Sequence, residues 1–443
     1  MKALIIAAGR GDRLRPYTDE RPKALVPLLG LHLIERSLLT AREAGIDDFV
    51  VVTGYRGDEV EKVLGDGKKY GIKIKYLHNR EWSKGNGVSV LRAKDELKDQ
   101  RFVLLMADHI FEPGILRSLK RLKSKSGECV LCVDRRIKNR DVKESTKVKL
   151  SGEKIVDIGK DIHRYSAIDC GIFICSSAIF EALEKGISEG RDELTDGVAY
   201  LAKRGAMRAF DIGGSDWFDI DTPGDLDRAE RFMLKKLTKK DDGLVAKHLN
   251  RKLSAPITRG LVKTNITPNQ VSILSFLIGI VSAFSFLGLS YPFLLLGGLL
   301  AQFCSVIDGV DGEIARLKFQ VTRYGGYLDS ILDRYADASI LIAITYTSYV
   351  IFGCQWIWIL GLLALFGSMM SMLSKQRFQS ATSRPYELTI EGKFRYIPAD
   401  RSARLFIIML GGISNQLIPC LCILAALTNV KALYRLVAVK RMI

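Results

Sequence analysis

Four aspartates lie close together in the apolar C-terminal part of the chain, where charged side chains are costly. Asp308 and Asp311 are three residues apart, and Asp329 and Asp333 are four apart. At the centre of a bilayer each charge costs roughly 2.5–3.5 kcal/mol, so four unpaired acids would cost about 10 kcal/mol. Both spacings place a pair on one face of a helix. Two such faces predict a cage of carboxylate oxygens for Mg²⁺ or Mn²⁺.

Small and basic residues surround these aspartates in a fixed pattern. Gly312 and Ala315 leave one helix surface bare, so a nucleotide can approach the backbone, and Arg316 can neutralise a phosphate. With Gly325 the stretch reads D-x2-D-G-x2-A-R-x8-G-x3-D-x3-D. Ordinary solvated acids at a cytoplasmic helix end are the alternative, which the coincidence of so many constrained positions disfavours.

This pattern resembles the signature of the CDP-alcohol phosphotransferases. The resemblance implies a six-helix membrane fold, usually dimeric, with a divalent metal site near the cytoplasmic surface. It also implies a reaction in which an alcohol attacks the phosphorus of a CDP-alcohol and CMP leaves. Asp308, Asp311 and Asp329 would be metal ligands, and Asp333 a ligand or the general base. The nucleotide is expected at the small and basic positions, Gly312, Ala315, Arg316 and Gly325.

The character of the chain changes near residue 235. The 443 residues are 48% apolar and carry a net charge of +17, but short apolar runs among charges give way to long uncharged stretches. We therefore predict a soluble α/β domain over 1–232, a basic linker over 233–268 and a membrane domain over 269–443. The apolar run at the N-terminus spans only about six residues, so no signal peptide and a cytoplasmic N-terminus are expected.

Six apolar stretches of the C-terminal part are each roughly long enough to cross a hydrocarbon core of about 30 Å, although the fifth is short. They cover 271–290, 291–307, 327–352, 355–373, 403–414 and 417–437. Lysines and arginines lie on one side of these spans, and the opposite connections carry no charge. The positive-inside rule then predicts a six-span protein of the cell membrane, with both termini and both active sites cytoplasmic.

The linker before the first span alternates basic and apolar residues between 235 and 263. This pattern suits an amphipathic helix lying at an anionic lipid surface, and a solvated linker is the alternative. Because the basic excess lies in this linker and on the cytoplasmic side of the spans, it indicates membrane lipid as a partner and argues against nucleic acid.

The segment 375–404 is the most basic and aromatic stretch on the side of the metal signature. A donor or acceptor that bears an extra phosphate needs cationic partners. The candidates are Lys375, Arg377, Arg395, Arg401 and Arg404. For any one of them, a charge that only sets the topology is an equally good explanation.

A glycine-rich segment follows the first apolar strand, residues 2–8, of the N-terminal part. Gly9 and Gly11 can bring backbone N–H groups close to phosphates, and Arg10 and Arg13 add charge. The full string, G-x-G-x-R-L-x-P-x-T followed by P-K-x-L-x-P with Lys23, resembles the signature of the sugar-phosphate nucleotidyltransferases.

This second resemblance implies a parallel α/β sheet like that of GT-A glycosyltransferases, and a metal that helps to join a phosphate monoester to a nucleoside triphosphate. Lys23 would act on the triphosphate. The nucleotide-binding residues implied are Ala8, Gly9, Arg10, Gly11, Arg13, Lys23, Asn79 and Gly85. Lys160 stands where the family often has a lysine for the monoester phosphate, although the usual Glu-Lys-Pro is not intact.

Three aspartates of the N-terminal part are candidate metal ligands. Asp108 ends an apolar strand, which is where open α/β sheets present ligands, and the resemblance implies that it binds metal. Asp219 is the expected second ligand and Asp221 the alternative. A plain turn built on Asp221-Thr222-Pro223 explains Asp221 equally well.

Together the halves resemble a family of bifunctional enzymes that join inositol-1-phosphate cytidylyltransferase to di-myo-inositol phosphate phosphate synthase. The resemblance implies that CTP and inositol 1-phosphate give CDP-inositol, and that a second inositol 1-phosphate then displaces CMP, as a step toward a compatible solute. The cofactor would be Mg²⁺ or Mn²⁺, and a homodimer through the membrane domain is expected. One alternative activates a choline- or ethanolamine-like phosphate and transfers it to a lipid alcohol. Another has an inactive N-terminal docking domain on a phospholipid synthase.

Overall fold

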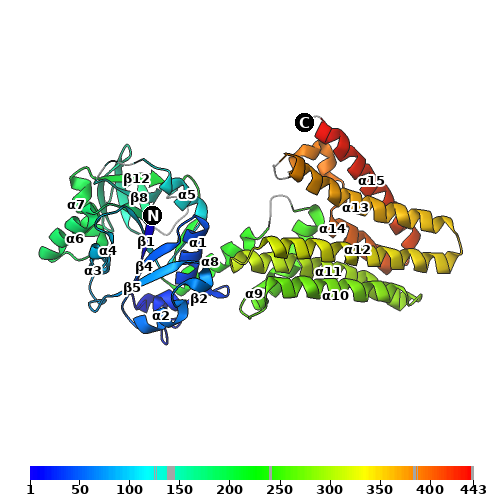
Figure 1. The fold of residues 1–443 in the computed structure, drawn as a ribbon, viewed down its shortest axis with the longest axis horizontal. Helices are drawn as coiled ribbons and strands as arrows, with labels where there is room; N and C mark the ends of the chain where they lie inside the picture. Colours follow the sequence, from blue (N-terminus) through cyan, green and yellow to red (C-terminus); the bar gives the residue numbers. More distant parts are fainter. Residues whose placement is uncertain are drawn as a thin grey trace. The chain divides into compact units, whose positions relative to one another are not determined.

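The structure is a computed structural model that describes residues 1–123, 125, 127–136, 145–238, 242–382, 386 and 388–440. The side chains of residues 388, 389, 393 and 395 lie outside the described set, so the candidate Arg395 is not placed. The chain forms two compact units, Met1–Phe232 and Met233–Ile443 (Figure 1).

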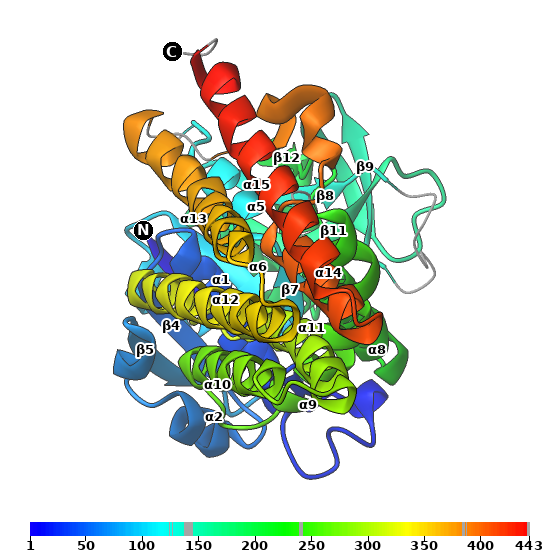
Figure 2. The ribbon, with the colours of Figure 1, turned by 90° about the vertical axis from the view of Figure 1, so that its right-hand side faces the viewer.

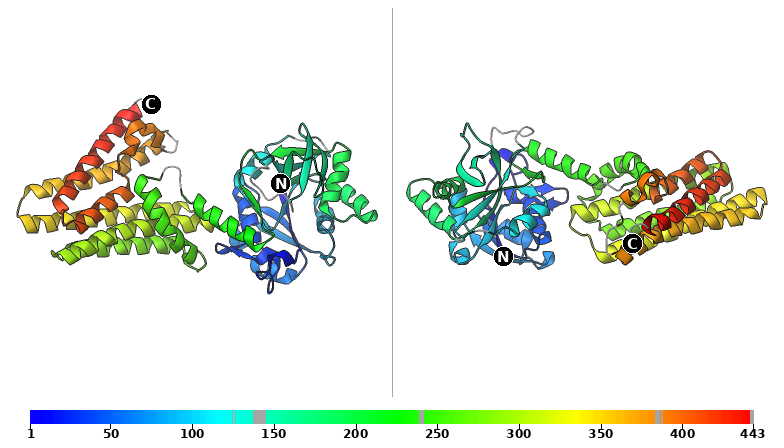
Figure 3. Two further views of the ribbon diagram at one scale, coloured as in Figure 1. Left: turned by 180° about the vertical axis from the view of Figure 1, so that it is seen from behind. Right: turned by 90° about the horizontal axis from the view of Figure 1, so that it is seen from above.

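The N-terminal unit contains a nine-stranded sheet, seen from two further sides in Figure 3. In sheet order the strands are β5 (Lys73–His78), β4 (Asp48–Thr53), β1 (Lys2–Ala7), β6 (Phe102–Met106), β11 (Ala167–Cys175), β8 (Cys129–Asp134), β12 (Met207–Asp211), β10 (Lys154–Gly159) and β9 (Lys147–Ser151). The first four strands run parallel. The long strand β11 runs antiparallel to both β6 and β8, and β8 and β12 beyond it are again parallel. The sheet is therefore mixed, and the expectation of a parallel sheet is met only in part.

Buried aliphatic side chains explain why these segments form central strands. All six residues of β8 are buried, as are four of the five in β6, which is typical of strands covered on both faces. The helices of the unit are α1 (Leu33–Glu43), α2 (Gly57–Leu64), α3 (Asn86–Leu91), α4 (Lys94–Leu97), α5 (Pro113–Lys120), α6 (Ala178–Ser188), α7 (Leu194–Lys203) and α8 (Pro223–Lys236). Phe180 of α6 stacks on Phe102 of β6 with ring centroids 5.5 Å apart, which fixes that helix on the sheet.

A two-stranded ribbon outside the main sheet carries several of the polar residues. Strand β7 (His109–Phe111) pairs antiparallel with β13 (Trp217–Asp219), and the register places His109 opposite Asp219. A second short ribbon joins β2 (Pro27–Leu28) to β3 (Leu31–His32). The β7–β13 pairing therefore brings together two segments that are more than one hundred residues apart in the sequence.

The C-terminal unit is helical in the part of the chain that the structure describes. Its long helices are α10 (Pro268–Phe286), α11 (Tyr291–Leu317), α12 (Arg323–Phe352), α13 (Trp356–Thr382), α14 (Arg401–Ile413) and α15 (Leu417–Lys440). Helices α10, α11 and α12 pack side by side (Figure 2). Among the described residues, five helices are long and apolar enough to span a membrane, and α14 is not one of them. With 13 residues α14 is only about 20 Å long, shorter than a hydrocarbon core.

The predicted linker helix begins later than its sequence pattern suggested. Helix α8 ends at Lys236, and a π-helical turn (Ala246–Asn250) leads directly into α9 (Arg251–Leu261). Lys239 and Lys240, which were part of the basic pattern, lie outside the described residues. The polar side chains of Ser254 and Thr258 in α9 are buried, and both donate hydrogen bonds to Glu313 of α11.

Candidate active sites in the two units

Lys23 lies at the centre of the polar site of the N-terminal unit. Its Nζ is 2.5 Å from Asp108 Oδ2 and 2.6 Å from Asp221 Oδ1. Arg13 Nη2 donates to the other oxygen of Asp221 at 2.8 Å. The side chain of Lys23 is only 13% exposed, so its ammonium is held by charge-assisted bonds in a shielded place. Asp221 therefore accepts hydrogen bonds from two cationic side chains, Lys23 and Arg13.

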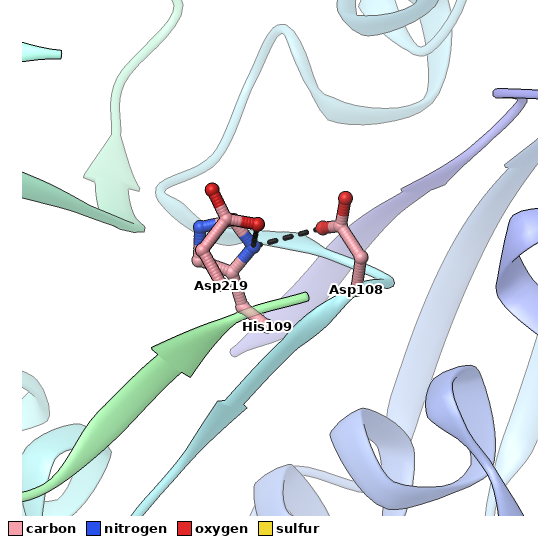
Figure 4. A group of neighbouring side chains, drawn as sticks. All are labelled: Asp108, His109 and Asp219. Atoms are coloured by element: carbon pink, nitrogen blue, oxygen red, sulfur yellow. Dashed lines mark hydrogen bonds and ion pairs between the residues drawn. The ribbon is translucent and has the colours of Figure 1, made fainter. Parts of the chain in front are cut away.

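Asp108, His109 and Asp219 form a second group at the same site (Figure 4). His109 Nδ1 lies 2.8 Å from Asp108 Oδ1 and 3.8 Å from Asp219 Oδ1. One ligand atom from each of the three residues lies within 4.8 Å of the others. Asp219 Oδ1 is buried and has no hydrogen-bond partner among the residues that the structure describes. Two carboxylates and an imidazole nitrogen form a donor set that fits a divalent cation.

The fold explains how this group is assembled. Asp108 follows β6 directly, and the β7–β13 register places Asp219 across from His109. Trp217 stacks on the imidazole with ring centroids 6.0 Å apart. Gly171 has a positive φ of 66°, and a Cβ there would come within 2.4 Å of His109 Nε2. Glycine at this position therefore leaves room for the ring.

The charged groups of this site shift one another's pKa values. Burial opposes a charge on His109, yet Asp219 and Asp108 raise the pKa of its imidazole to about 9. Burial, with Asp108 nearby, raises the pKa of Asp219 to about 6. Burial penalises the ammonium of Lys23, but Asp108 and Asp221 hold the pKa of Lys23 above its usual value. The charge of each of these groups therefore depends on the charges of its neighbours.

A cavity of about 860 Å³ opens onto these residues. Predicted residues that line it are Gly9, Gly11, Arg13, Lys23, Asp108, Lys160, Asp219 and Asp221. His109 and Asp169 also line the cavity, and the sequence reasoning had given no role to His109. A signal for His109 was present in the sequence, because it directly follows Asp108, the aspartate at the end of a strand. Burial raises the pKa of Asp169 to about 6.

Four predicted nucleotide-binding residues are engaged by the protein itself. The fully buried Asn79 donates to Ser89 Oγ at 2.9 Å. Gly85 packs against the backbone of Asp192, where a Cβ would come within 2.4 Å of the carbonyl oxygen. Ala8 is buried, and its carbonyl accepts from the amide of Tyr55. Arg10 pairs with Asp12 at 3.1 Å.

Three aspartates of α11 and α12 meet in the C-terminal unit. Carboxylate oxygens of Asp308, Asp329 and Asp333 lie within 4.8 Å of one another. Arg401 Nη1, at the start of α14, is 2.9 Å from Asp308 Oδ1 and 3.0 Å from Asp333 Oδ1. An oxygen-only donor set at the end of two helices fits a hard divalent cation.

The other residues of the signature lie around this trio. Asp311 is buried and accepts from Ser272 Oγ at 2.5 Å and from the amide of Gly312. Arg316 Nη2 donates to the carbonyl of Leu237 at 3.4 Å. The amide of Gly325 donates to Thr322 Oγ1 at 2.9 Å, which caps the start of α12. Ala315 is half-buried.

The basic candidates of residues 375–404 separate into different environments. Arg401 and Arg404 are nearly buried and share Asp337, whereas Arg377 is exposed. Lys375 Nζ lies 5.9 Å from the centre of the Tyr386 ring. Asp337 was not predicted, although it continues the four-residue spacing of Asp329 and Asp333 beyond the end of the family signature.

Two buried ion-pair groups were also missed by the sequence reasoning. Glu391 accepts from Arg435 at 2.7 Å and lies 3.1 Å from Lys431 Nζ. Glu313 accepts from Arg251 at 2.5 Å. Each group joins segments that are far apart in the sequence, and no local spacing could have revealed it.

Comparisons with known proteins agree with this two-part organisation. Residues 2–236 match the nucleotidyl transferase family, and residues 265–437 match the CDP-alcohol phosphatidyltransferase family. A protein of Rubrobacter xylanophilus named bifunctional IPC transferase and DIPP synthase is 37% identical over 441 residues, covering 99% of this chain and 96% of that protein. A protein of Aquifex aeolicus with the same name is 34% identical, covering 97% of this chain and 96% of that protein.

A solved structure resembles the N-terminal part. It is the inositol-1-phosphate CTP transferase from T. maritima, 29% identical, with a TM-score of 0.48, covering 53% of this chain and 95% of that chain. The family assignment rests on the two relatives that match nearly the whole chain. Because it is 37% and 34% identical to them over nearly its full length, this chain belongs to the family of bifunctional IPC transferases and DIPP synthases.

Proposed function

We propose that this chain catalyses two consecutive reactions of inositol phosphate. In the first, an oxygen of the phosphate of inositol 1-phosphate attacks the α-phosphorus of CTP, giving CDP-inositol and pyrophosphate. In the second, a hydroxyl of another inositol 1-phosphate attacks the phosphorus that carries inositol, and CMP leaves. The observation that carries this proposal is the near full-length similarity to bifunctional relatives, in a chain with a separate carboxylate cluster in each unit.

In the N-terminal unit, Lys23 and Arg13 are proposed to bind the triphosphate, together with the backbone of Gly9 and Gly11. A phosphate monoester is already an anionic nucleophile near neutral pH, so the site must mainly hold two anions in line. Asp108 and Asp219, with His109, would hold a divalent cation, which would neutralise charge at the α-phosphate. Asp221 is proposed to orient Lys23 and Arg13, since it contacts both.

In the C-terminal unit, a neutral hydroxyl must lose a proton, so a base is required. Asp333 is proposed as that base. Asp308, Asp311 and Asp329 would hold the divalent cation, which would screen the charge of the CDP-inositol pyrophosphate. Gly312, Ala315 and Arg316 are proposed to face the nucleotide, and Lys160, Lys375 and Arg377 remain candidates for substrate phosphates in the two units.

We further propose that the C-terminal unit lies in the cell membrane, with both termini cytoplasmic. The five long apolar helices support a membrane protein, and the short helix α14 would be the sixth membrane-embedded segment. The basic residues on one side of the spans support this orientation. A homodimer through the membrane helices and contact of α9 with anionic lipid are part of the same proposal.

The test is an assay of the intact detergent-solubilised chain with CTP and labelled inositol 1-phosphate. Release of pyrophosphate and then CMP, with a labelled product that stays in water, supports the proposal. A product that extracts into chloroform only when diacylglycerol is added would support the lipid head-group alternative. Failure to release pyrophosphate with any phosphate monoester would support an inactive docking domain.

A further inference from the structure

One buried carboxylate outside the family signature organises two arginines of the membrane site. Asp337 Oδ1 lies 3.0 Å from Arg401 Nε, and its Oδ2 accepts from Arg404 Nη2 at 2.6 Å. The side chain of Asp337 is 6% exposed. Because both of its oxygens are engaged by arginines, Asp337 anchors cations and is not available as a metal ligand.

The two arginines differ in what else they contact. Arg404 Nη1 donates to the carbonyl of Ala399 at 3.1 Å, and Nη2 also lies 3.7 Å from Met372 Sδ. Arg404 is thus bound to its own surroundings. Arg401, three residues earlier on the same helix, extends past Asp337 toward the carboxylate trio.

The contact of Arg401 with the trio is electrostatic. Its Nη1 lies within 3.0 Å of both Asp308 and Asp333, but it is buried and directs no N–H along a hydrogen bond to either. Its Nη2 has the weak acceptor Cys304 Sγ at 3.6 Å. A side chain that is 10% exposed therefore points a positive charge between two acids without being locked to them.

We propose that Arg401 is a built-in counter-cation of the membrane site, and that Asp337 is the residue that positions it. This inference rests on the proposed function, in which Asp308 and Asp329 of the trio hold a divalent cation and Asp333 is the base beside it. A guanidinium at 3 Å neutralises part of the charge of Asp308 and Asp333. The guanidinium allows several acids to lie close together while shielded from solvent. It also weakens their affinity for a divalent cation, since like charges repel strongly at such distances.

Arg401 therefore lowers the affinity of this site for a divalent cation. A site of uncompensated aspartates would bind a divalent ion tightly and hold the leaving CMP with it. Arg401 reduces that attraction, and its guanidinium lies next to the place proposed for the ion. Arg404 pairs with the other oxygen of Asp337 and does not contact the trio.

The experiment measures Mn²⁺ binding by electron paramagnetic resonance in the intact detergent-solubilised chain. An Asp108→Asn background removes the site of the N-terminal unit, so the remaining Asp308-dependent signal reports the membrane site. Arg401→Gln is expected to lower the Kd for Mn²⁺ by about tenfold or more, because a repelling charge about 3 Å from the ligand Asp308 and from the neighbouring Asp333 is lost. Tighter binding cannot result from simple loss of folding.

Two further variants separate charge from structure. Arg401→Lys keeps the charge and is expected to leave the Kd within about threefold of the parent, as is Arg404→Gln, whose charge lies farther from the trio. Unchanged or weaker Mn²⁺ binding in Arg401→Gln would overturn the inference, and so would equal tightening in Arg404→Gln. If Asp308→Asn removes no Mn²⁺ from the Asp108→Asn parent, the proposed membrane metal site itself fails, which is a different result.

Discussion

The two carboxylate clusters of this protein are neutralised in different ways. In the N-terminal unit Lys23 makes direct ion pairs at 2.5 and 2.6 Å with Asp108 and Asp221. In the C-terminal unit Arg401 reaches Asp308 and Asp333 at 2.9 and 3.0 Å without directed hydrogen bonds. The first arrangement hydrogen-bonds its cation to both carboxylates, and the second places a guanidinium between two carboxylates by electrostatic contact.

The difference follows from the chemistry proposed for each site. The first reaction needs no base, so its charges only have to hold anions in line. The second must take a proton from a hydroxyl, so one carboxylate has to remain able to accept it. A strong, rigid ion pair to every acid would prevent this. The comparison therefore predicts that variants in one cluster leave the other reaction intact.

The largest effect is expected for Asp333→Asn. Loss of the proposed base should lower CMP release by about 10²–10⁴-fold, while CDP-inositol accumulates. The measurement is chromatography of nucleotides from the intact chain with CTP and inositol 1-phosphate. Pyrophosphate release in the same sample is the internal control. A parallel loss of pyrophosphate release would mean that the two sites are not independent.

The second effect is expected for Lys23→Ala, which leaves Asp108 and Asp221 without their shared ammonium. Pyrophosphate release should fall by about 10²–10³-fold, as for other charge-stabilising groups. When CDP-inositol is supplied, CMP release should continue at the parental rate. The exposed Lys62→Ala serves as a matched control and should change neither rate. Loss of the second reaction in Lys23→Ala would contradict the proposed division of labour.

A smaller effect should distinguish Asp219 from Asp221. Asp219 belongs to the group with Asp108 and His109, and Asp221 contacts Lys23 and Arg13. Asp219→Asn should raise the Mn²⁺ concentration needed for half-maximal pyrophosphate release by about 10–100-fold. Asp221→Asn should mainly raise the KM for CTP, with little change in the Mn²⁺ requirement. The reverse pattern would exchange the two roles.

The smallest effect on catalysis is expected for Glu313→Gln, which tests packing. Glu313 is buried and holds α9 through Arg251, Ser254 and Thr258. Breaking a buried ion pair costs about 3–5 kcal/mol, so the unfolding midpoint of the C-terminal unit should fall. The exposed pair of Arg56 and Glu59 offers the contrast, since Glu59→Gln should cost about 1 kcal/mol or less. Equal effects of Glu313→Gln and Glu59→Gln on thermal unfolding would contradict the proposed role of Glu313 in holding α9.

Much of the membrane site could be anticipated because its spacing is local. Residues three or four apart share a helix face, so Asp329 and Asp333 had to lie together once α12 formed. The same rule extends to Asp337, but the family signature ends before it. Sequence alone could not rank Arg401 against Arg404, because their different partners depend on how α14 meets α11 and α12.

The N-terminal site was harder to anticipate. Asp108 could be recognised at the end of an apolar strand, but its neighbours come from distant segments. His109 faces Asp219 only because β7 pairs with β13 in one register. A shift by one residue would send these side chains to opposite faces of the ribbon.

The amino-acid sequence by itself determined the two families, the division into a soluble-type and an apolar part, and the helix faces that carry the aspartates. These depend on composition and on short periodic spacings. Only the tertiary structure decided which strand ends meet, where α14 begins and ends, and that Arg401 points between Asp308 and Asp333. Contacts between distant segments depend on how whole elements pack, and this packing cannot be deduced from any local sequence pattern.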